Sequence, residues 1–387
     1  MLPSRHKRVR GGHPWAYSNE IAMDATAKKL PLGSLVRLQA ANGEPLGVAM
    51  FNPHTLIAAR LLARDDKVRI DQAFLEEKFL AAVELREKLY PGGYYRLIHA
   101  EADGLPGLIV DRYGALVVVQ PNTAGIARLL PELLAALDAV IDPTTVVVRG
   151  DTAARKLEGL DEDVRVAKGT LDGLSELMEN GARFVVDLGG GQKTGWFYDQ
   201  RENRASVARL AKDARVLDTY SYAGGFAVTA ALAGAREVIA VDRSQPALDL
   251  AAESARRNDV AARCTFVRAE AFEELERLGT AGERFDIVIT DPPAFVKSRK
   301  DIQAGARGYR KLARLASALV TPGGFLFIAS CSHNLDRTGF DEMVALGLRD
   351  TARTGRLLRS SGAGADHPVH PMLPESQYLK GALLQLD

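Results

Sequence analysis

The chain has 387 residues, 47% hydrophobic and 26% charged, with a formal net charge of +1, which is typical of a folded globular protein of two or three domains. It contains no apolar run of about 18 residues that would span a membrane, and its basic start lacks the apolar segment of a signal peptide, so we expect a cytoplasmic protein. Its two cysteines and seven scattered histidines exclude a disulfide framework and zinc-like spacing, so we predict no structural disulfide and no metal.

The first 70 residues form a basic, β-rich segment. They contain eleven Lys or Arg and five Asp or Glu. This asymmetry favours a polyanionic partner about as much as it favours an ordinary basic surface. Short alternating apolar runs between residues 32 and 62 are interrupted by "ANGEP" and "NPH", which is the pattern of hairpins in a small β-barrel. We therefore predict a first domain over residues 1–70.

Residues 71–180 have the pattern of a separate α+β domain. Apolar residues recur at helical spacing in "IDQAFLEEKFLAAVELREKL" (70–89), which predicts a long helix. The segments that follow indicate two strands, a helix through "AGIARLLPELLAALDAV", and a strand at "TTVVVRG". No catalytic cluster is evident in this part of the chain.

From about residue 181 the sequence alternates between strands and helices. The apolar runs are "RFVVDL", "ARVLDTY", "EVIAVD", "CTFVRAE", "FDIVITD" and "GFLFIASC". Alternation of this kind predicts an α/β fold with a doubly wound, mainly parallel, Rossmann-like sheet over residues 181–387.

The first strand–helix unit of this sheet has the features of a nucleotide-type site. The turn in "VLDTYSYAGGFAVTAALAGA" carries Gly224 and Gly225, which allow close approach of a ligand. Asp242 ends the next strand, 24 residues after Asp218, where a carboxylate can accept hydrogen bonds from ribose hydroxyls. A dinucleotide would require G-x-G-x-x-G, so we favour S-adenosylmethionine, with Asp218 near its cationic methionine part. Glu270 either meets the adenine edge or lies on the surface.

The reacting end of the site is predicted from two further strand ends. Asp291 ends "FDIVITD" and precedes two prolines that hold the loop extended. Cys331 ends "GFLFIASC". Methylation of carbon 5 of a pyrimidine requires a thiolate that adds to carbon 6, and Cys331 could supply it. A buried core cysteine is the alternative, but the polar neighbours Ser330, Ser332 and His333 favour a reactive thiol.

A basic stretch lies between these two motifs. Residues 296–314 contain seven Lys or Arg and one Asp. A solvated helix face would explain the pattern, but the position beside the predicted base pocket also suits an RNA backbone.

The motifs "DTYSYAGGFAV", "VDRSQPALDLA", "DPPAF" and "SCS" resemble those of class I S-adenosylmethionine-dependent RNA methyltransferases. Further stretches, "HPWAYS", "YRLIHAEADGLPGLIVDRYG", "KTGWFYDQR" and "ADHPV", are similar to the bacterial 23S ribosomal RNA cytosine-5 methyltransferases over nearly the whole chain. The resemblance implies an RNA-binding PUA domain over 1–70, a central α+β domain over 71–180, a methyltransferase domain over 181–387, and large-subunit ribosomal RNA as the partner.

The resemblance also implies site residues. Cys331 would be the nucleophile, and Asp291 would contact the target cytosine. The cofactor would be bound by a larger set: Lys193, Thr194, Gln200, Arg201, Asp218, Tyr220, Ala223, Gly224, Gly225, Asp242, Arg243, Glu270, Ala271, Asp291 and Pro292.

One departure from related enzymes leaves part of the chemistry unassigned. Ala294 stands where many RNA cytosine-5 methyltransferases have a second cysteine, so the base that removes the carbon-5 proton is unidentified. A ribosomal RNA guanine-N methyltransferase and a non-catalytic RNA-binding assembly factor stay open as alternative functions. Whether the chain forms a homodimer is also open.

Overall fold

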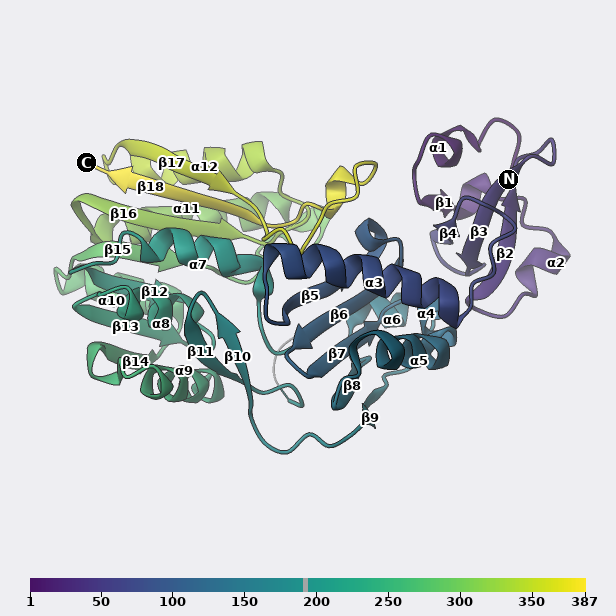
Figure 1. Ribbon diagram of the computed structural model, residues 1–387. Coiled ribbons are helices and arrows are strands. Elements are labelled where there is room, and N and C mark those ends of the chain that lie inside the picture. Colours follow the sequence, from purple (N-terminus) through teal and green to yellow (C-terminus); the bar gives the residue numbers. More distant parts are fainter. Residues whose placement is uncertain (191–193) are drawn as a thin grey trace. The chain divides into compact units, whose positions relative to one another are not determined.

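The computed structural model describes residues 1–190 and 194–387 (Figure 1). These residues divide into two compact units. Unit 1 comprises residues 1–173, 187–198 and 365–374, and unit 2 comprises residues 174–186, 199–364 and 375–387. The chain thus passes between the units repeatedly. The division into three domains at residues 70 and 180 stays a prediction.

The N-terminal part of unit 1 is an antiparallel sheet in the order β1-β4-β3-β2. Its β-rich character agrees with the alternating runs of the sequence. Gly47 shows why one position needs glycine: its φ is +131°, and a Cβ there would lie 2.0 Å from the carbonyl oxygen of Ala63. The elements are α1 (Lys7–Arg10), β1 (Trp15–Tyr17), α2 (Ala25–Lys28), β2 (Ser34–Gln39), β3 (Pro45–Phe51) and β4 (Ile57–Ala63).

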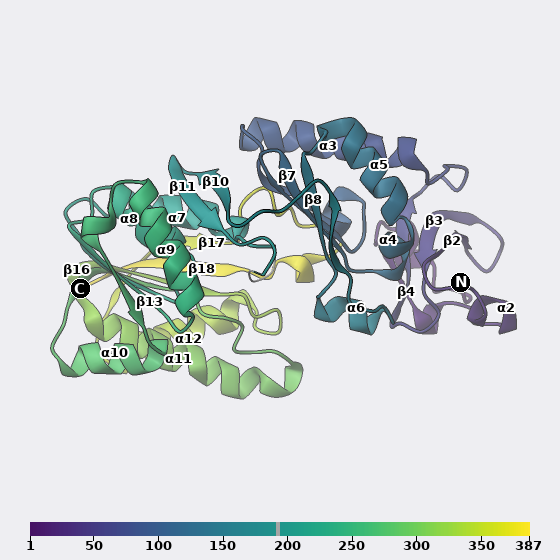
Figure 2. The same cartoon turned by 90° about the horizontal axis from the view of Figure 1, so that it is seen from below.

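The rest of unit 1 is built on a sheet in the order β5-β6-β7-β8-β9, in which β7 and β8 pair in parallel and the other neighbours pair antiparallel. Asp71 caps the N-terminus of the long helix α3: its side chain accepts a hydrogen bond from the Phe74 amide at 3.3 Å. Helices α3 and α5 lie on one face of the sheet (Figures 1 and 2) and share its core. The elements are α3 (Gln72–Leu89), β5 (Tyr94–His99), β6 (Leu108–Tyr113), β7 (Leu116–Pro121), α4 (Ala124–Arg128), α5 (Leu130–Ile141), β8 (Thr145–Arg149), α6 (Ala153–Leu157) and β9 (Val164–Lys168).

Unit 2 begins with an antiparallel hairpin of β10 (Ser175–Glu179) and β11 (Ala182–Val186). The prediction that "RFVVDL" belongs to the parallel sheet is wrong, because β11 pairs with β10. Asn180 and Gly181 form the turn with φ values of +52° and +78°. Two successive positive φ values are what a tight hairpin needs, and an Asn-Gly pair supplies them.

Among the described residues, the main sheet of unit 2 has seven strands in the order β14-β13-β12-β15-β16-β18-β17. The first five are parallel, whereas β18 is antiparallel to both β16 and β17. Helices cover both faces, with α8 and α9 on one side and α10, α11 and α12 on the other (Figure 2). The strands are β12 (Arg215–Thr219), β13 (Glu237–Asp242), β14 (Cys264–Arg268), β15 (Phe285–Thr290), β16 (Val320–Ser330), β17 (Gly355–Ser361) and β18 (Lys380–Leu386). The helices are α7 (Arg201–Ala208), α8 (Gly225–Leu232), α9 (Gln245–Arg257), α10 (Ala271–Thr280), α11 (Ile302–Leu319) and α12 (Arg337–Arg349).

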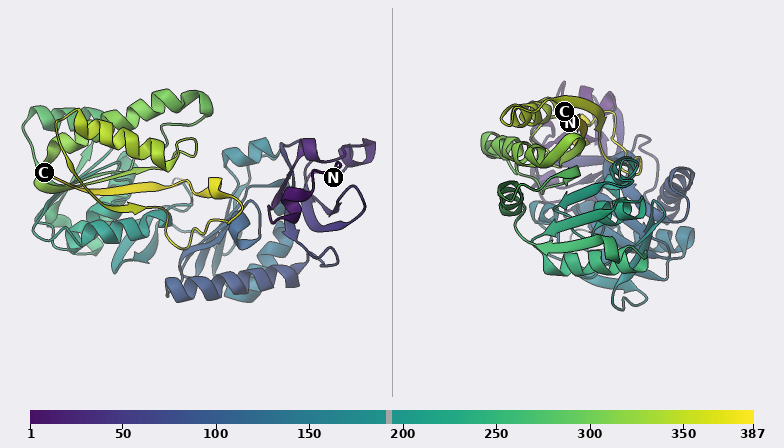
Figure 3. Two further views of the ribbon diagram at one scale, coloured as in Figure 1. Left: turned by 90° about the horizontal axis from the view of Figure 1, so that it is seen from above. Right: turned by 90° about the vertical axis from the view of Figure 1, so that its left-hand side faces the viewer.

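This arrangement confirms the predicted α/β fold with a Rossmann-like sheet. The central strands β12 and β15 are buried on both faces, which explains their continuous apolar runs, whereas the edge strand β14 has only partly buried and exposed residues. Because β12, β13, β15 and β16 run in the same direction, their carboxyl ends meet at one edge of the sheet, where open α/β sheets bind ligands. Figure 3 shows β18, in yellow, along the same sheet. Within the described ranges, no helix has the length and apolar character required to span a membrane.

Candidate active site

The loop between β12 and α8 is shaped for close contact with a ligand. Tyr220 and Tyr222 have φ values of +62° and +48°, a conformation that costs energy for a side chain other than glycine and that clusters at functional sites. Gly224 caps α8 with a φ of +77°. A Cβ there would lie 2.8 Å from the Cβ of Ala251. The glycine is therefore required both by the backbone and by the packing of α8 on α9.

Asp218 provides a buried carboxylate at the end of β12. Its Oδ2 accepts a hydrogen bond from the Ala227 amide at 3.0 Å, but its Oδ1 has no partner among the described residues, although the residue is only 1% exposed. Burial raises the pKa of Asp218 well above its usual value, and the carboxylates of Asp291 and Asp242 raise it further. A buried acceptor without a partner is costly. A cationic ligand would satisfy it, which fits the amino acid part of S-adenosylmethionine.

The next two strand ends carry the predicted contacts to the nucleoside. Asp242 accepts hydrogen bonds from the amides of Tyr222 and Ser244, both at 2.9 Å. These bonds fix the carboxylate while leaving lone pairs for ribose hydroxyls. Glu270 is exposed at the start of α10. It lies near Tyr220, because Glu270 adds to the effect of burial in raising the pKa of Tyr220.

The other predicted cofactor residues of unit 2 border the same strand ends. Ala223, Gly225, Ala271 and Pro292 are buried and Arg243 is exposed. The structure adds Arg204, which the sequence patterns did not indicate: a Cβ at Gly225 would lie 2.5 Å from its Nε, and its charge lowers the pKa of Asp218. Ser221 was also missed. Its buried Oγ has no partner in the described part of the chain, so it is another group that a ligand could satisfy.

The reacting end is formed by the loops that follow β15 and β16. Cys331 comes directly after the last residue of β16 and is half-buried. Its Sγ lies 3.9 Å from the carbonyl oxygen of Pro292. Asp291 comes directly after the last residue of β15, and its carboxylate is close enough to Asp218 to raise the pKa of that residue. The thiol and the carboxylate predicted to act on one base are thus at adjacent strand ends, as parallel strands require.

Ser332 fastens these two loops together. Its buried Oγ accepts a hydrogen bond from the Val296 amide at 3.1 Å and is 2.9 Å from the Tyr309 hydroxyl. Tyr309 extends from α11 and is fully buried. These contacts among Ser332, Val296 and Tyr309 hold the backbone next to Cys331 against the loop that follows Asp291. They therefore restrict the positions that the Cys331 thiol can take.

The two cysteines differ in their surroundings. Cys264 is half-buried at the start of β14, and burial raises its pKa to about 11. A thiol of this kind is protonated at neutral pH and is a poor nucleophile. This agrees with its interpretation as a small hydrophobic residue.

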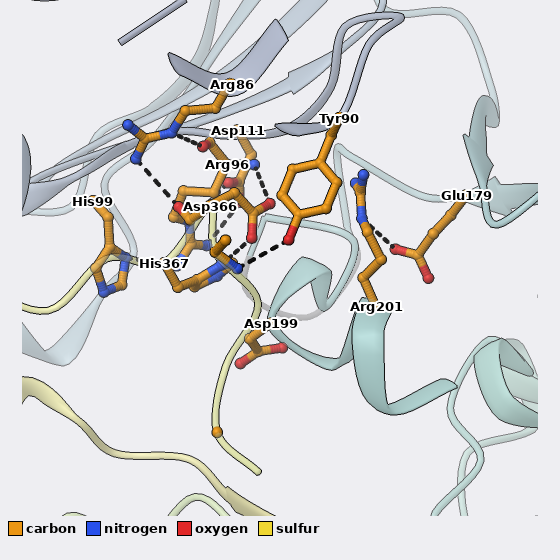
Figure 4. Close-up of polar contacts among 12 residues, drawn as sticks. Arg86, Tyr90, Arg96, His99, Asp111, Glu179, Asp199, Arg201, Asp366 and His367 are labelled. Carbon is orange, nitrogen blue, oxygen red and sulfur yellow. Dashed lines mark hydrogen bonds and ion pairs between the residues drawn. The ribbon is translucent and has the colours of Figure 1, made fainter. Parts of the chain in front are cut away.

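The "KTGWFYDQR" segment is divided between the units. Lys193 lies outside the described residues. Thr194 belongs to unit 1, where its buried hydroxyl donates to the Asp111 carboxylate. Gln200 and Arg201 belong to unit 2 and are buried. Arg201 forms an ion pair with Glu179 at 3.6 Å (Figure 4). A role for these four residues at the cofactor stays a prediction.

The "ADHPV" segment is held in unit 1. Its Asp366 accepts a hydrogen bond from the Arg96 amide at 3.0 Å through its carboxylate and one from the Arg86 guanidinium at 3.2 Å through its carbonyl (Figure 4). Arg96 also forms two hydrogen bonds of 2.8 Å with the buried Asp111. The buried charges of Arg96 and Asp111 are therefore paired, as burial requires, and the hydrogen bonds of Asp366 anchor the segment in this unit.

Comparison with known proteins identifies the family. Residues 162–362 match the family model of S-adenosylmethionine-dependent methyltransferases, and residues 1–64 match that of PUA-like domains. The chain is 36% identical over 390 residues to ribosomal RNA large subunit methyltransferase I of Cronobacter sakazakii, with 98% of this chain and 97% of that protein covered. The chain belongs to the S-adenosylmethionine-dependent methyltransferases.

Solved structures of candidate methyltransferases share the fold of this methyltransferase. One from Streptococcus mutans has a TM-score of 0.82 at 22% identity, covering 98% of this chain and 97% of the other. Another, solved in complex with SAH, has a TM-score of 0.83 at 21% identity, with the same coverage. The predictions of a methyltransferase, of S-adenosylmethionine as its cofactor and of an N-terminal PUA-like domain are confirmed.

Proposed function

We propose that this methyltransferase forms 5-methylcytidine in large-subunit (23S) ribosomal RNA, with Cys331 as the nucleophile. The observation that carries the proposal is the position of Asp291 and Cys331 directly after the adjacent parallel strands β15 and β16, with the Cys331 Sγ 3.9 Å from the carbonyl oxygen of Pro292. The name of the relative in Cronobacter sakazakii supports the choice of substrate. A guanine-N methyltransferase would need no thiol at this position.

The chemistry assigns one task to each side chain. The Cys331 thiolate forms a bond from Sγ to carbon 6 of the cytosine, and the electrons of the 5,6 double bond become available at carbon 5. When bound, S-adenosylmethionine would supply the electrophilic methyl group for carbon 5, and the electron pair of its sulfur–methyl bond would stay on the departing S-adenosylhomocysteine. Loss of the carbon-5 proton to a base then restores the double bond and releases the thiolate. Asp291 would accept a hydrogen bond from the cytosine amino group, which orients the base.

Two exposed basic surfaces support an RNA substrate. The PUA-like domain of unit 1 carries exposed basic side chains that form no ion pair among the described residues: Arg5, Lys7, Lys28, Lys29 and Arg37. In unit 2, Arg310 and Lys311 of the basic stretch are paired with Asp350 and Glu276. The basic residues nearest the Asp291 loop, Lys297, Arg299, Lys300 and Arg307, are exposed and form no ion pair in the described chain. Such cations gain affinity for phosphates by releasing counterions.

The direct test is to incubate the protein with S-adenosylmethionine and protein-free large-subunit ribosomal RNA that lacks modifications, and to identify methylated nucleosides by mass spectrometry. A gain of 5-methylcytidine is expected. Methylated guanosine would contradict the role of Cys331, and cofactor binding without methyl transfer to this RNA or to assembling ribosomal particles would indicate a non-catalytic assembly factor. We also propose a cytoplasmic location, because the proposed substrate is a bacterial ribosomal RNA. Whether the chain forms a homodimer stays a prediction.

Substitution of the two cysteines separates their roles. Cys331→Ala should abolish methyl transfer while cofactor affinity, measured by calorimetry, stays within about twofold, because Asp218 and Asp242 are untouched. Cys264→Ala is the matched control and should retain activity. Full activity of Cys331→Ala would refute the covalent mechanism.

A further inference from the structure

A buried lysine lies beside the proposed nucleophile. Lys380 opens β18, which pairs with β16 so that Lys380 stands opposite Ser330, the residue before Cys331. The residue is only 4% exposed. Lysine is seldom buried to this extent without a specific reason, because the charged ammonium loses its hydration.

The Lys380 side chain is held in place by the loop that carries the thiol. Its Nζ donates hydrogen bonds to the carbonyl oxygen of Ser332 at 2.9 Å and to that of Tyr378 at 2.7 Å. A protonated Lys380 has three N–H hydrogens, and these two bonds use two of them. The third remains available for another acceptor. Neither carbonyl carries a charge, and Lys380 forms no ion pair within the described residues. A structural lysine would be expected to have a carboxylate partner.

The electrostatic surroundings tie Lys380 to Cys331. Burial lowers the pKa of Lys380 to about 8, the nearby Arg337 lowers it as well, and Cys331 and Asp336 act in the opposite direction. Other titratable groups face the same place from neighbouring elements: Tyr309 of α11, which is also sensitive to Cys331, and His333, whose ring stacks on Tyr378. An amine with this pKa can exist in either protonation state near neutral pH.

We propose that Lys380 is the positioning residue that takes up the thiol proton of Cys331 and then, as an ammonium, holds the thiolate ready for attack. The Sγ–H bond breaks, its electron pair stays on sulfur, and the proton moves to the lone pair of the neutral Nζ. The neutral pair becomes an ion pair with no change in net charge. The catalytic importance of this step rests on the proposed function of Cys331, but the ionisation itself can be measured without RNA.

The proposal also accounts for how a thiolate could form at strand ends that carry several carboxylates. The carboxylates of Asp242 and Asp291 are close enough to Asp218 to raise the pKa of that residue. Negative charges near a thiol raise its pKa and so oppose formation of a thiolate. A cation beside the thiol counteracts them, and among the described residues the side chain of Lys380 is anchored directly to the loop that carries Cys331.

The test follows the alkylation of Cys331 by iodoacetamide as a function of pH, in protein that carries Cys264→Ser so that one thiol reacts. Wild-type Lys380 should give a midpoint below that of an ordinary cysteine, about 8.5. Lys380→Met should raise the midpoint by about one pH unit and slow alkylation near neutral pH about tenfold. Lys311→Met, on α11 and paired with Glu276, is the matched control and should leave the curve unchanged.

A second variant distinguishes the two parts of the role. Lys380→Arg keeps a positive charge but cannot accept a proton in this pH range, so it should retain a low midpoint through its charge alone, whereas Lys380→Met should not. A wild-type midpoint at or above that of an ordinary thiol would overturn the proposal even if Lys380→Met does not fold, and so would a folded Lys380→Met with an unchanged midpoint. A product other than 5-methylcytidine would refute the proposed function without altering the alkylation curve.

Discussion

Removal of the Ser332 hydroxyl tests whether the contact between the two active-site loops matters for catalysis. In Ser332→Ala, the buried Val296 amide loses its acceptor at 3.1 Å, whereas the Tyr309 hydroxyl keeps Ser330 as a hydrogen-bond partner. One buried donor without a partner costs about 1–3 kcal/mol. A loss of about 2 kcal/mol lowers the Tm of a domain of roughly 150–250 residues by about 4–8 °C.

Ser332→Ala should reduce the rate of methyl transfer by more than its loss of about 2 kcal/mol in folding stability would explain. Without the Ser332 hydrogen bonds, the Cys331 loop is no longer fixed against the Asp291 loop, and a displacement of about 1 Å can reduce a rate about 100-fold. Thermal unfolding measures the first effect, and single-turnover methyl transfer at saturating RNA measures the second.

Ser254→Ala provides the matched control. Ser254 is also fully buried, and its Oγ accepts a hydrogen bond from the Val185 amide at 3.0 Å, but it lies on α9 rather than in the Cys331 loop. It should lose a similar amount of stability and keep its methyl-transfer rate. If Ser332→Ala and Ser254→Ala lose the same stability and both keep full rates, then the Ser332 hydroxyl is structural only, and our reasoning about the loops is wrong.

Three further predictions concern the cofactor and RNA surfaces. Gly224→Ala should weaken cofactor binding, measured by calorimetry, because a side chain at φ +77° costs about 1–2 kcal/mol and its Cβ would clash with Ala251; unchanged affinity would contradict this. Burial raises the pKa of Asp218 in the folded protein, so its contribution to stability is full at acidic pH, below the ordinary Asp pKa, and is lost as the pH rises through the folded-state value. Asp218→Asn should therefore stabilise the cofactor-free protein near neutral pH in thermal unfolding and weaken cofactor binding about tenfold. The last prediction concerns the exposed basic residues near the Asp291 loop: Lys297, Arg299, Lys300 and Arg307. Their replacement by alanine should reduce the slope of log RNA affinity against log salt concentration by about 0.7 for each phosphate that is no longer neutralised. An unchanged slope would place the RNA elsewhere.

The parts of the site that the sequence predicted follow from one rule of parallel sheets. Asp218, Asp242, Asp291 and Cys331 each end an apolar run, and parallel strands bring their carboxyl ends to one edge. The order of the strands did not have to be known. Local sequence therefore sufficed to group these four residues.

The residues that the sequence missed depend on pairings between distant segments. Lys380 reaches Cys331 because β18 inserts antiparallel beside β16, and no local pattern specifies that neighbour. Nothing in the local sequence of Ser332 or Tyr309 indicates a role at the site. Their contact forms because α11 packs against the loop that carries Ser332. The strand "RFVVDL" was misplaced because its apolar run resembles a parallel strand, although the Asn180-Gly181 turn indicated a hairpin.

The strand order of unit 2 also constrains how the protein can be made. β17 precedes β18 in the chain but pairs only with it, since β18 lies between β16 and β17. While the chain is being synthesised, β17 has no place in the sheet, and β16 has one open, apolar edge until β18 emerges. Such an edge can pair with other chains, so β18, the strand that carries Lys380, also covers an edge of β16 that would otherwise be open to intermolecular pairing.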